Sequence, residues 1–194
     1  KSVGYKNLIL NSKGVIKKRD ETYIDLSSIA KGFSVDIISS LLSSLGFKKH
    51  LVDIGGELKG RGLKYKGKKK KWAVGIEMPY GRRKVSSVVN LFNKAIATSG
   101  NYRNFRKSKD GVTLVHTISP KTGRPIRNRL VSATVLDDEC MKADALATTF
   151  MAMGFNKAKK FAEQHSIPSL FILIETGHLK TVLTKSFKEY LGDS

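Results

Sequence analysis

Cysteine is almost absent from this sequence of 194 residues, since Cys140 is its only one. A single thiol excludes an internal disulfide framework and any zinc site that needs several cysteines. The sequence also lacks an apolar run of ~18 residues, so it predicts no membrane-spanning helix. Aromatic residues make up only 8 % and do not alternate with basic residues, which argues against a stacking platform for single-stranded nucleic acid.

Acidic residues are scarce beside basic ones: 16 Asp and Glu stand against 36 Lys and Arg, and the formal net charge is +20. That charge by itself indicates an anionic partner, such as nucleic acid, a membrane surface or a phosphorylated small molecule. The sequence contains no helix-turn-helix, zinc-finger or RNA-recognition signature. The lysine run at residues 67–71 is typical of a solvated hairpin loop. Nucleic acid is therefore not the partner that we expect.

The length and the 40 % hydrophobic content predict one domain over residues 1–194, without a linker or a repeat. Short strands are expected at residues 15–18, 22–26, 50–54, 72–77, 85–92, 95–98, 114–118, 131–136, 170–175 and 179–184. Strands and helices are mixed without regular βαβ alternation. We therefore predict an α+β fold, with a mixed and largely antiparallel sheet and packed helices.

Three helices are predicted. Apolar residues recur at every fourth position over residues 29–45, which indicates one face of a helix with Ser27 or Ser28 as its cap. A second helix is expected to begin near Cys140, and a third to begin with Asn156 as its cap.

The segment at residues 54–62 is rich in glycine but matches neither a Walker loop nor a dinucleotide-binding fingerprint. The pair Gly55-Gly56 follows a predicted strand, and glycine lets a ligand approach the backbone closely. A plain tight turn explains the same pattern, so both interpretations stay open.

Asp144 and Thr148 stand four residues apart on the second predicted helix, so they share one of its faces. A carboxylate and a hydroxyl are hard oxygen ligands of the kind that Mg²⁺ prefers. The alternative is that Asp144 interacts with the helix dipole and that Thr148 bonds back to a helix carbonyl.

Lys31 lies in the first turns of the first predicted helix, where a helix start and a lysine together form an anion site. His116 stands at the end of a predicted strand and, with an unperturbed pKa of about 6.5, suits a general base. A solvated lysine and a structural histidine are the alternatives. His50, His165 and His178 are expected at the surface.

In their order, seven segments resemble the ApbE family, the flavin transferases that attach FMN to proteins. Residues 25–36 are similar to the family pattern Asp-Leu-x-x-Ile-Ala-Lys-Gly-Tyr-x-Val-Asp, and residues 116–125 to His-Ile-Ile-Asp-Pro-x-Thr-Gly-x-Pro. The full set is residues 3–5, 25–36, 51–57, 72–79, 97–103, 116–125 and 140–148. The resemblance covers nearly the whole chain and implies an ApbE-like fold.

The resemblance implies a magnesium-dependent transfer with FAD as the donor. A Ser or Thr hydroxyl of an acceptor protein would attack the FMN-side phosphorus, and AMP would leave. Mg²⁺ would be held by Asp144, Thr148 and the Ala30 carbonyl, while Lys31 and His116 would be catalytic. The implied contacts to the flavin nucleotide are Gly55, Gly56, Glu57, Thr98, Ser99, Gly100 and Asp36.

Other interpretations remain open from the sequence. Water in place of the acceptor hydroxyl would make the chain an FAD pyrophosphatase, and loss of chemistry would leave a flavin-binding module. The resemblance implies an acceptor flavoprotein of the redox-pump subunit type and a location in the bacterial periplasm or cell envelope. The surplus of lysines leaves open solubility, an acidic acceptor or association with a membrane surface.

The sequence departs from the family pattern in three ways. Ser119 stands where the family usually has Asp, and Asn101 replaces a frequent Asp. Family members also carry a substantial segment before the Val-Gly-Tyr pattern. Because this sequence begins with Lys1 and not with a conventional start, we expect a chain trimmed at its front, the C-terminal portion of the family's usual length. A front segment supplied by a second chain or lost, and a shortened member with altered binding, are the alternatives.

Overall fold

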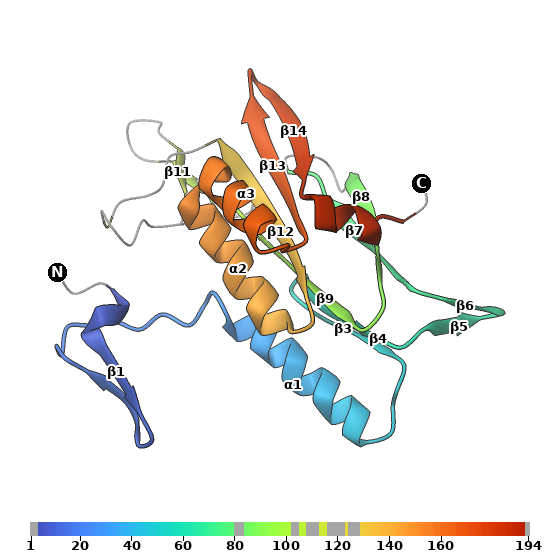
Figure 1. The fold of residues 1–194 in the computed structure, drawn as a ribbon, viewed down its shortest axis with the longest axis horizontal. Helices are drawn as coiled ribbons and strands as arrows, with labels where there is room; N and C mark the ends of the chain where they lie inside the picture. Colours follow the sequence, from blue (N-terminus) through green and yellow to red (C-terminus); the bar gives the residue numbers. More distant parts are fainter. Residues whose placement is uncertain are drawn as a thin grey trace.

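A six-stranded antiparallel sheet forms the centre of the computed structural model (Figure 1). The structure describes residues 4–79, 84–101, 105–107, 113–115, 123 and 129–192. The strand order is β14-β13-β12-β9-β4-β3, and every neighbouring pair is antiparallel. The strands are β3 (His50–Ile54), β4 (Glu57–Arg61), β9 (Lys94–Gly100), β12 (Leu130–Asp137), β13 (Ser169–Glu175) and β14 (His178–Leu183). The predicted α+β class with a largely antiparallel sheet is confirmed.

Both faces of the sheet are buried, because successive side chains of a strand point to opposite faces. In β13, Phe171 and Leu173 belong to one hydrophobic cluster, whereas Leu170 and Ile172 belong to another. All four side chains are at most 1 % exposed. The central strands are therefore continuous apolar runs, which is typical of a sheet covered on both sides.

Three helices cover one face, namely α1 (Ala30–Ser44), α2 (Cys140–Met153) and α3 (Phe155–Gln164) (Figure 1). Phe150 of α2 packs there against Phe171 of the sheet, with ring centroids 5.7 Å apart. The other face is covered by the hairpin of β7 (Trp72–Glu77) and β8 (Val85–Leu91) and by the 3-10 helix η2 (Lys185–Tyr190). Over the described ranges, no helix has the length and apolar content to cross a membrane.

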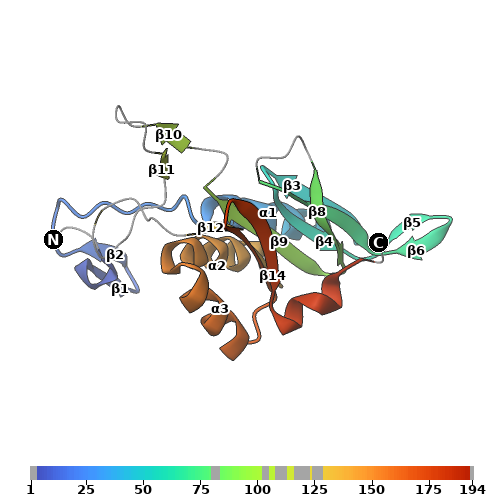
Figure 2. The same ribbon diagram turned by 90° about the horizontal axis from the view of Figure 1, so that it is seen from above.

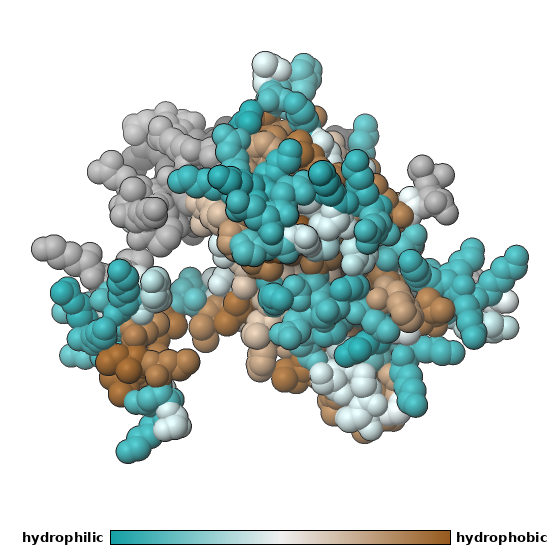
Figure 3. Space-filling model, in the orientation of Figure 1, coloured by the Kyte–Doolittle hydropathy of each residue, from teal (hydrophilic) through white to brown (hydrophobic). Residues whose placement is uncertain are grey.

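Three small hairpins lie outside these layers. The 3-10 helix η1 (Tyr5–Asn7) leads into β1 (Leu8–Asn11) and β2 (Gly14–Lys17), and two shorter hairpins pair β5 (Lys64–Lys66) with β6 (Lys68–Lys70) and β10 (Phe105–Lys107) with β11 (Thr113–Val115). Figures 1 and 2 place β1–β2 and β5–β6 at opposite ends of the molecule. Figure 3 shows a group of hydrophobic atoms over β1–β2, where Ile9, Leu10, Val15 and Ile16 are exposed.

Several sequence predictions about local structure were wrong. Residues 22–26 form no strand, and β4 was not predicted at all. Neither Ser27 nor Ser28 caps α1, because the residue at the cap position is Ile29 and it makes no side-chain cap bond. Gly154, not Asn156, takes the cap position of α3.

The apolar face predicted for α1 points the other way from the sheet. Phe33, Ile37 and Leu41 are half exposed, whereas Gly32 and Val35 are buried. Gly32 faces the start of α2, at Cys140, because a residue without a side chain lets the two helices approach closely. His50 is also buried rather than at the surface: its ring bonds the Ser39 hydroxyl at 2.9 Å and the Phe47 carbonyl at 2.8 Å.

Candidate functional site

A pocket of about 890 Å³ opens where β4 and β9 part, a volume typical of small-molecule sites. The two strands pair over three positions, from Gly60 opposite Lys94 to Leu58 opposite Ile96. Beyond Ile96, β9 no longer pairs with β4, so the two strands are free to diverge. The lining residues are Asp25, Ser27, Ser28, Lys31, Leu51, Asp53, Gly55, Gly56, Glu57, Leu58, Ala73, Val74, Gly75, Ile76, Glu77, Ile96, Thr98, Ser99, Gly100, Asp144, Thr148 and Ala152. Nine of the predicted site residues are therefore brought together: Lys31, Gly55, Gly56, Glu57, Thr98, Ser99, Gly100, Asp144 and Thr148.

The close crossing of α1 and α2 forms one wall of the pocket. A Cβ at Gly32 would lie 2.4 Å from the carbonyl oxygen of Cys140, so only glycine fits at this contact. The Gly32 N–H donates to Oδ2 of Asp144 at 3.1 Å. This contact holds the Asp144 carboxylate beside the first turn of α1, next to Lys31.

Asp36 is not among the lining residues, and its carboxylate has a different role. It accepts the backbone N–H groups of Cys140 and Met141 at 3.1 and 2.9 Å, which caps the N-terminus of α2 from a neighbouring helix. The same carboxylate pairs with the nearly buried ammonium of Lys59. In this structure the carboxylate that was predicted to contact a nucleotide positions α2.

Glu57 and Lys31 form an ion pair in the lining, with Oε1 and Nζ 2.7 Å apart. The Glu57 side chain is almost completely buried, and its Oε2 has no hydrogen-bond partner. Burial raises the pKa of Glu57, and the pairing with Lys31 offsets that rise only in part. One buried carboxylate oxygen therefore remains available to a ligand.

The Asp144 carboxylate is also buried, at 3 % exposure. Desolvation raises its pKa, while the N–H of Gly32 and the charge of Lys31 act in the opposite direction. Cys140 lies just before it in α2, and burial together with Asp36 and other nearby carboxylates raises the pKa of that thiol to about 12. Cys140 is consequently a buried packing residue and not a nucleophile.

The pocket has the opposite charge from the protein as a whole. Its described lining carries five carboxylates, those of Asp25, Asp53, Glu57, Glu77 and Asp144, and a single lysine, in a protein of net charge +20. A phosphate group entering this lining would meet more acidic than basic side chains, so its entry would be electrostatically unfavourable without added positive charge.

Asp144 and Thr148 lie on the same face of α2, and both line the pocket. The Thr148 hydroxyl bonds to the Ser99 hydroxyl of β9 at 2.8 Å, which joins the helix to the strand end. Ala30 does not line the pocket, and its carbonyl accepts the Ser34 hydroxyl at 2.8 Å. The structure thus brings together two of the three predicted magnesium ligands. Where side chains are described, no group of three or more His, Cys, Asp and Glu residues forms a metal cluster.

The turn between β3 and β4 contains the glycine pair. Gly55 and Gly56 have φ values of 66° and 98°, a conformation that favours glycine. The Gly56 N–H donates to the Asp53 carboxylate at 3.0 Å. The turn is tight, as one interpretation predicts, and it lines the pocket; close approach of a ligand to its backbone stays a prediction.

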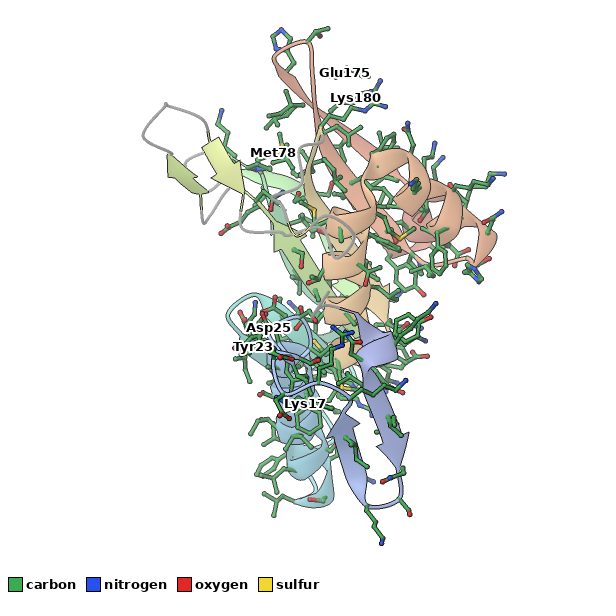
Figure 4. All side chains as sticks on the ribbon, turned by 90° about the vertical axis from the view of Figure 1, so that its left-hand side faces the viewer. Lys17, Tyr23, Asp25, Met78, Glu175 and Lys180 are labelled. Carbon is green, nitrogen blue, oxygen red and sulfur yellow. The ribbon has the colours of Figure 1, made fainter. Side chains whose placement is uncertain are left out.

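Sequence reasoning missed several lining residues. Asp25 lies on the extended segment that leads to α1 (Figure 4), where its carboxylate accepts the Ser27 N–H and its pKa is lowered by that bond. The acidic side chains of Asp53 and Glu77 were likewise not singled out. All three lie within the quoted family segments, which was the signal available to find them. His116 and Ser119 lie outside the residues that the structure describes.

The ApbE family profile matches residues 1–171 of the chain. This chain belongs to the ApbE family. The FAD:protein FMN transferase of Vibrio cholerae is 42 % identical over 190 residues, which cover 97 % of this chain and 56 % of the relative. The enzyme of the same name from Escherichia coli K12 is 36 % identical over 176 residues, covering 90 % and 49 %. The chain therefore spans about half the length of the curated relatives it matches.

Solved structures of the ApbE family share the fold. The flavin transferase ApbE from Vibrio cholerae superposes with a TM-score of 0.85 at 41 % identity, covering 97 % of this chain and 59 % of that one. The ApbE protein from Thermotoga maritima gives 0.84 at 30 % identity, covering 98 % and 60 %. The fold is that of the ApbE transferases.

Five of the seven segments that resemble the ApbE family meet at the pocket. They supply Lys31 from residues 25–36, Glu57 from residues 51–57, residues 73–77 of β7, Thr98–Gly100 of β9, and Asp144 with Thr148 from residues 140–148. By contrast, the ion pair of Glu175 and Lys180 lies toward the tip of β13–β14, away from Asp25 in Figure 4. The family pattern is therefore concentrated at one site of the fold.

Proposed function

We propose that this chain carries the catalytic site of an FAD:protein FMN transferase, which moves FMN from FAD to a Ser or Thr hydroxyl of an acceptor protein and releases AMP. The observation that carries the proposal is the convergence of five ApbE-family segments on one acidic pocket. Membership of a family whose relatives bear that enzyme name supports the same function.

The residues present fit a magnesium ion. Asp144 and Thr148 offer a carboxylate and a hydroxyl from one helix face, and the buried Oε2 of Glu57 has no partner. Hard oxygen donors and an excess of buried negative charge are what Mg²⁺ requires. Asp144 and Thr148 would hold the ion, and the Ala30 carbonyl would join them only by giving up its bond to Ser34. When bound, the ion would neutralise phosphate charge and act as a Lewis acid.

The protein's own groups would bind and orient FAD. The Lys31 ammonium, held by Glu57, directs positive charge toward the pyrophosphate. The backbone of Gly55 and Gly56 allows the nucleotide to approach closely. Together with the first turn of α1, these groups place the phosphorus for attack, which is the main requirement of phosphoryl transfer.

The chemical step exchanges a phosphoanhydride bond for a phosphoester bond at the FMN-side phosphorus. The acceptor hydroxyl oxygen forms a bond to the FMN-side phosphorus, the bond from that phosphorus to the bridging oxygen breaks, and AMP carries that oxygen away. We propose His116 as the general base that takes the proton of the hydroxyl. Replacing His116 by Asn should abolish transfer while FAD still binds, which isothermal titration calorimetry would measure.

Mass spectrometry of the acceptor tests the function directly. The purified protein is incubated with FAD, Mg²⁺ and an acceptor that carries a Ser/Thr target motif. We expect the acceptor to gain the mass of one FMN and one AMP to be released for each modified acceptor. Asp144→Ala should abolish both, whereas Asp138→Ala, a change at an exposed carboxylate paired with Lys94, should retain both. Free FMN and AMP without a modified acceptor would instead indicate a pyrophosphatase, and bound FAD without products would indicate a binding module.

The acceptor and the location are further parts of this proposal. We propose a flavoprotein of the redox-pump subunit type as acceptor and the periplasm or cell envelope as the site of action, both by resemblance to the family. Cell fractionation with an antibody to this chain would test the location. Detection of the chain only in the cytosolic fraction would contradict it.

A further inference from the structure

Residues 64–71, here called the lysine hairpin, form a strongly basic projection. It contains Lys64, Lys68, Lys69, Lys70 and Lys71, and the side chains of the last four are exposed. Figures 1 and 2 show β5 and β6 extending from the body of the protein, and Figure 3 shows hydrophilic atoms at the tip. Tyr65, 72 % exposed, is the aromatic side chain of this projection.

The base of the lysine hairpin is anchored to the body. The Trp72 indole N–H lies 3.1 Å from the carbonyl oxygens of both Arg61 and Gly62, on the opposite strand of the connection. Gly60 packs against the same ring, where a Cβ would come within 3.0 Å of it. The projection is therefore held in a set direction although its own strands are three residues long.

The charges of the lysine hairpin are not neutralised within the protein. Over the part of the chain that the structure describes, ion pairs form at Lys31, Lys59, Lys94, Arg129, Lys142 and Lys180. None involves Lys64 or residues 68–71. Clustered like charges without internal partners favour an anionic surface outside the protein.

The chemistry of the lysine hairpin favours a fluid surface over a specific macromolecule. Lysine is a compact point charge on a flexible stem, whereas paired recognition of phosphates or carboxylates is the property of arginine, which residues 64–71 lack. The eight residues of the hairpin are also far fewer than the roughly 20–30 a side that a stable protein interface uses. Tyr65 adds an amphipathic ring of the kind enriched at membrane–water interfaces.

We propose that the lysine hairpin docks this protein onto an anionic lipid bilayer. The hairpin joins β4 to β7, and both strands line the pocket, so docking would hold the pocket close to the membrane surface. The proposal concerns binding alone and does not depend on the proposed transferase function. Each lysine near such a surface contributes about a fivefold gain in affinity.

Co-sedimentation with lipid vesicles tests the docking. The vesicles are phosphatidylcholine with about one-third phosphatidylglycerol, and pure phosphatidylcholine serves as the neutral reference. We expect binding to the anionic vesicles alone, in about 0.1 M salt, and release in about 1 M salt, where the Debye length falls from about 10 to 3 Å. Changing five of the six lysines of the hairpin (Lys64, Lys68, Lys69, Lys70 and Lys71) to Gln should weaken binding by about a hundredfold or more.

A matched variant separates the hairpin from general charge. It changes five exposed lysines elsewhere to Gln, namely Lys13, Lys157, Lys160, Lys185 and Lys188, and so removes the same total charge. This variant should lose less than about tenfold in affinity. Equal losses in the two variants would overturn the proposal, as would binding of wild type to polyglutamate or duplex DNA but not to the anionic vesicles.

Discussion

The carboxylate of Asp144 accepts the backbone N–H of Gly32 at 3.1 Å, at the point where the first turns of α1 and α2 meet. The bond joins residues 112 positions apart and is buried. It sets the position of the carboxylate proposed to hold magnesium by means of a helix contact that tolerates only glycine. The shape of the site therefore depends on how closely two helices can approach.

Replacing Gly32 by Ala should destabilise the protein. Helix propensity alone would make the change stabilising by about 1 kcal/mol. The new Cβ would, however, lie 2.4 Å from the Cys140 carbonyl oxygen, and such overpacking costs about 1–3 kcal/mol. We expect a lower Tm in differential scanning calorimetry and weaker Mg²⁺ binding in calorimetric titration. The exposed Ser40→Ala should change neither, and a raised Tm for Gly32→Ala would contradict the contact.

Replacing Asp144 by Asn should raise stability in metal-free buffer at neutral pH. Burial raises the pKa of Asp144, so the folded state favours the protonated form. The contribution of Asp144 to stability is therefore fully present below its ordinary pKa of 3.8 and is lost as the pH rises through its folded-state pKa. The neutral variant escapes that loss, and its advantage in Tm should disappear on acidification toward about pH 3. A constant difference in Tm across this range would contradict the assignment.

Replacing Asp36 by Asn should destabilise the protein strongly. The change leaves the ammonium of Lys59, only 6 % exposed, without its carboxylate, and breaking a buried pair costs about 3–5 kcal/mol. Urea unfolding would measure the loss. The double variant Asp36→Asn with Lys59→Met should recover part of it, with a coupling of about 1–3 kcal/mol. Additive effects would show that the two residues act independently.

Replacing Lys31 by Met should weaken binding of FAD more than it slows transfer. Loss of one charged contact to the pyrophosphate costs about 1.5–3 kcal/mol, which is at least a tenfold rise in KM. Steady-state kinetics would separate KM from kcat, and Lys48→Met, at an exposed site after α1, serves as the control. A large fall in kcat with KM unchanged would mean that Lys31 acts only in the transition state.

The sheet was largely predictable because its strands carry strong local patterns. The run at β12 and the hairpin of β13 and β14 were placed to within one or two residues. β4 was missed because Gly60 and Lys59 are poor strand formers, and its place depends on Trp72, which packs over Gly60. Residues 22–26 alternate like a strand, but no neighbouring strand pairs with them.

The orientation of α1 shows what periodicity cannot decide. The pattern identified Phe33, Ile37 and Leu41 as one face, and they do share a face. It did not identify the buried side, because Gly32 and Ser39 are not apolar and are buried where neighbouring elements come close. The buried face of α1 is therefore decided by how closely neighbouring elements approach the helix, and not by the hydrophobicity of its residues.

The candidate site was predictable only through the resemblance to a family. Spacing placed Asp144 and Thr148 on one helix face, but nothing local connects them to Lys31 or to the Gly55–Gly56 turn. The role of Asp36 could not be predicted either, because the backbone groups that it caps lie more than 100 residues away in sequence.

The lone cysteine of the sequence allows the separation of α1 and α2 to be timed. Cys140 is completely buried at the start of α2, and its pKa of about 12 keeps the thiol protonated. A thiol reagent can therefore modify the native protein only during moments when the two helices separate. Because the sequence has no second cysteine, the rate of thiol labelling measures how often α1 and α2 separate. A bound nucleotide or cation that holds the two helices together will lower that rate.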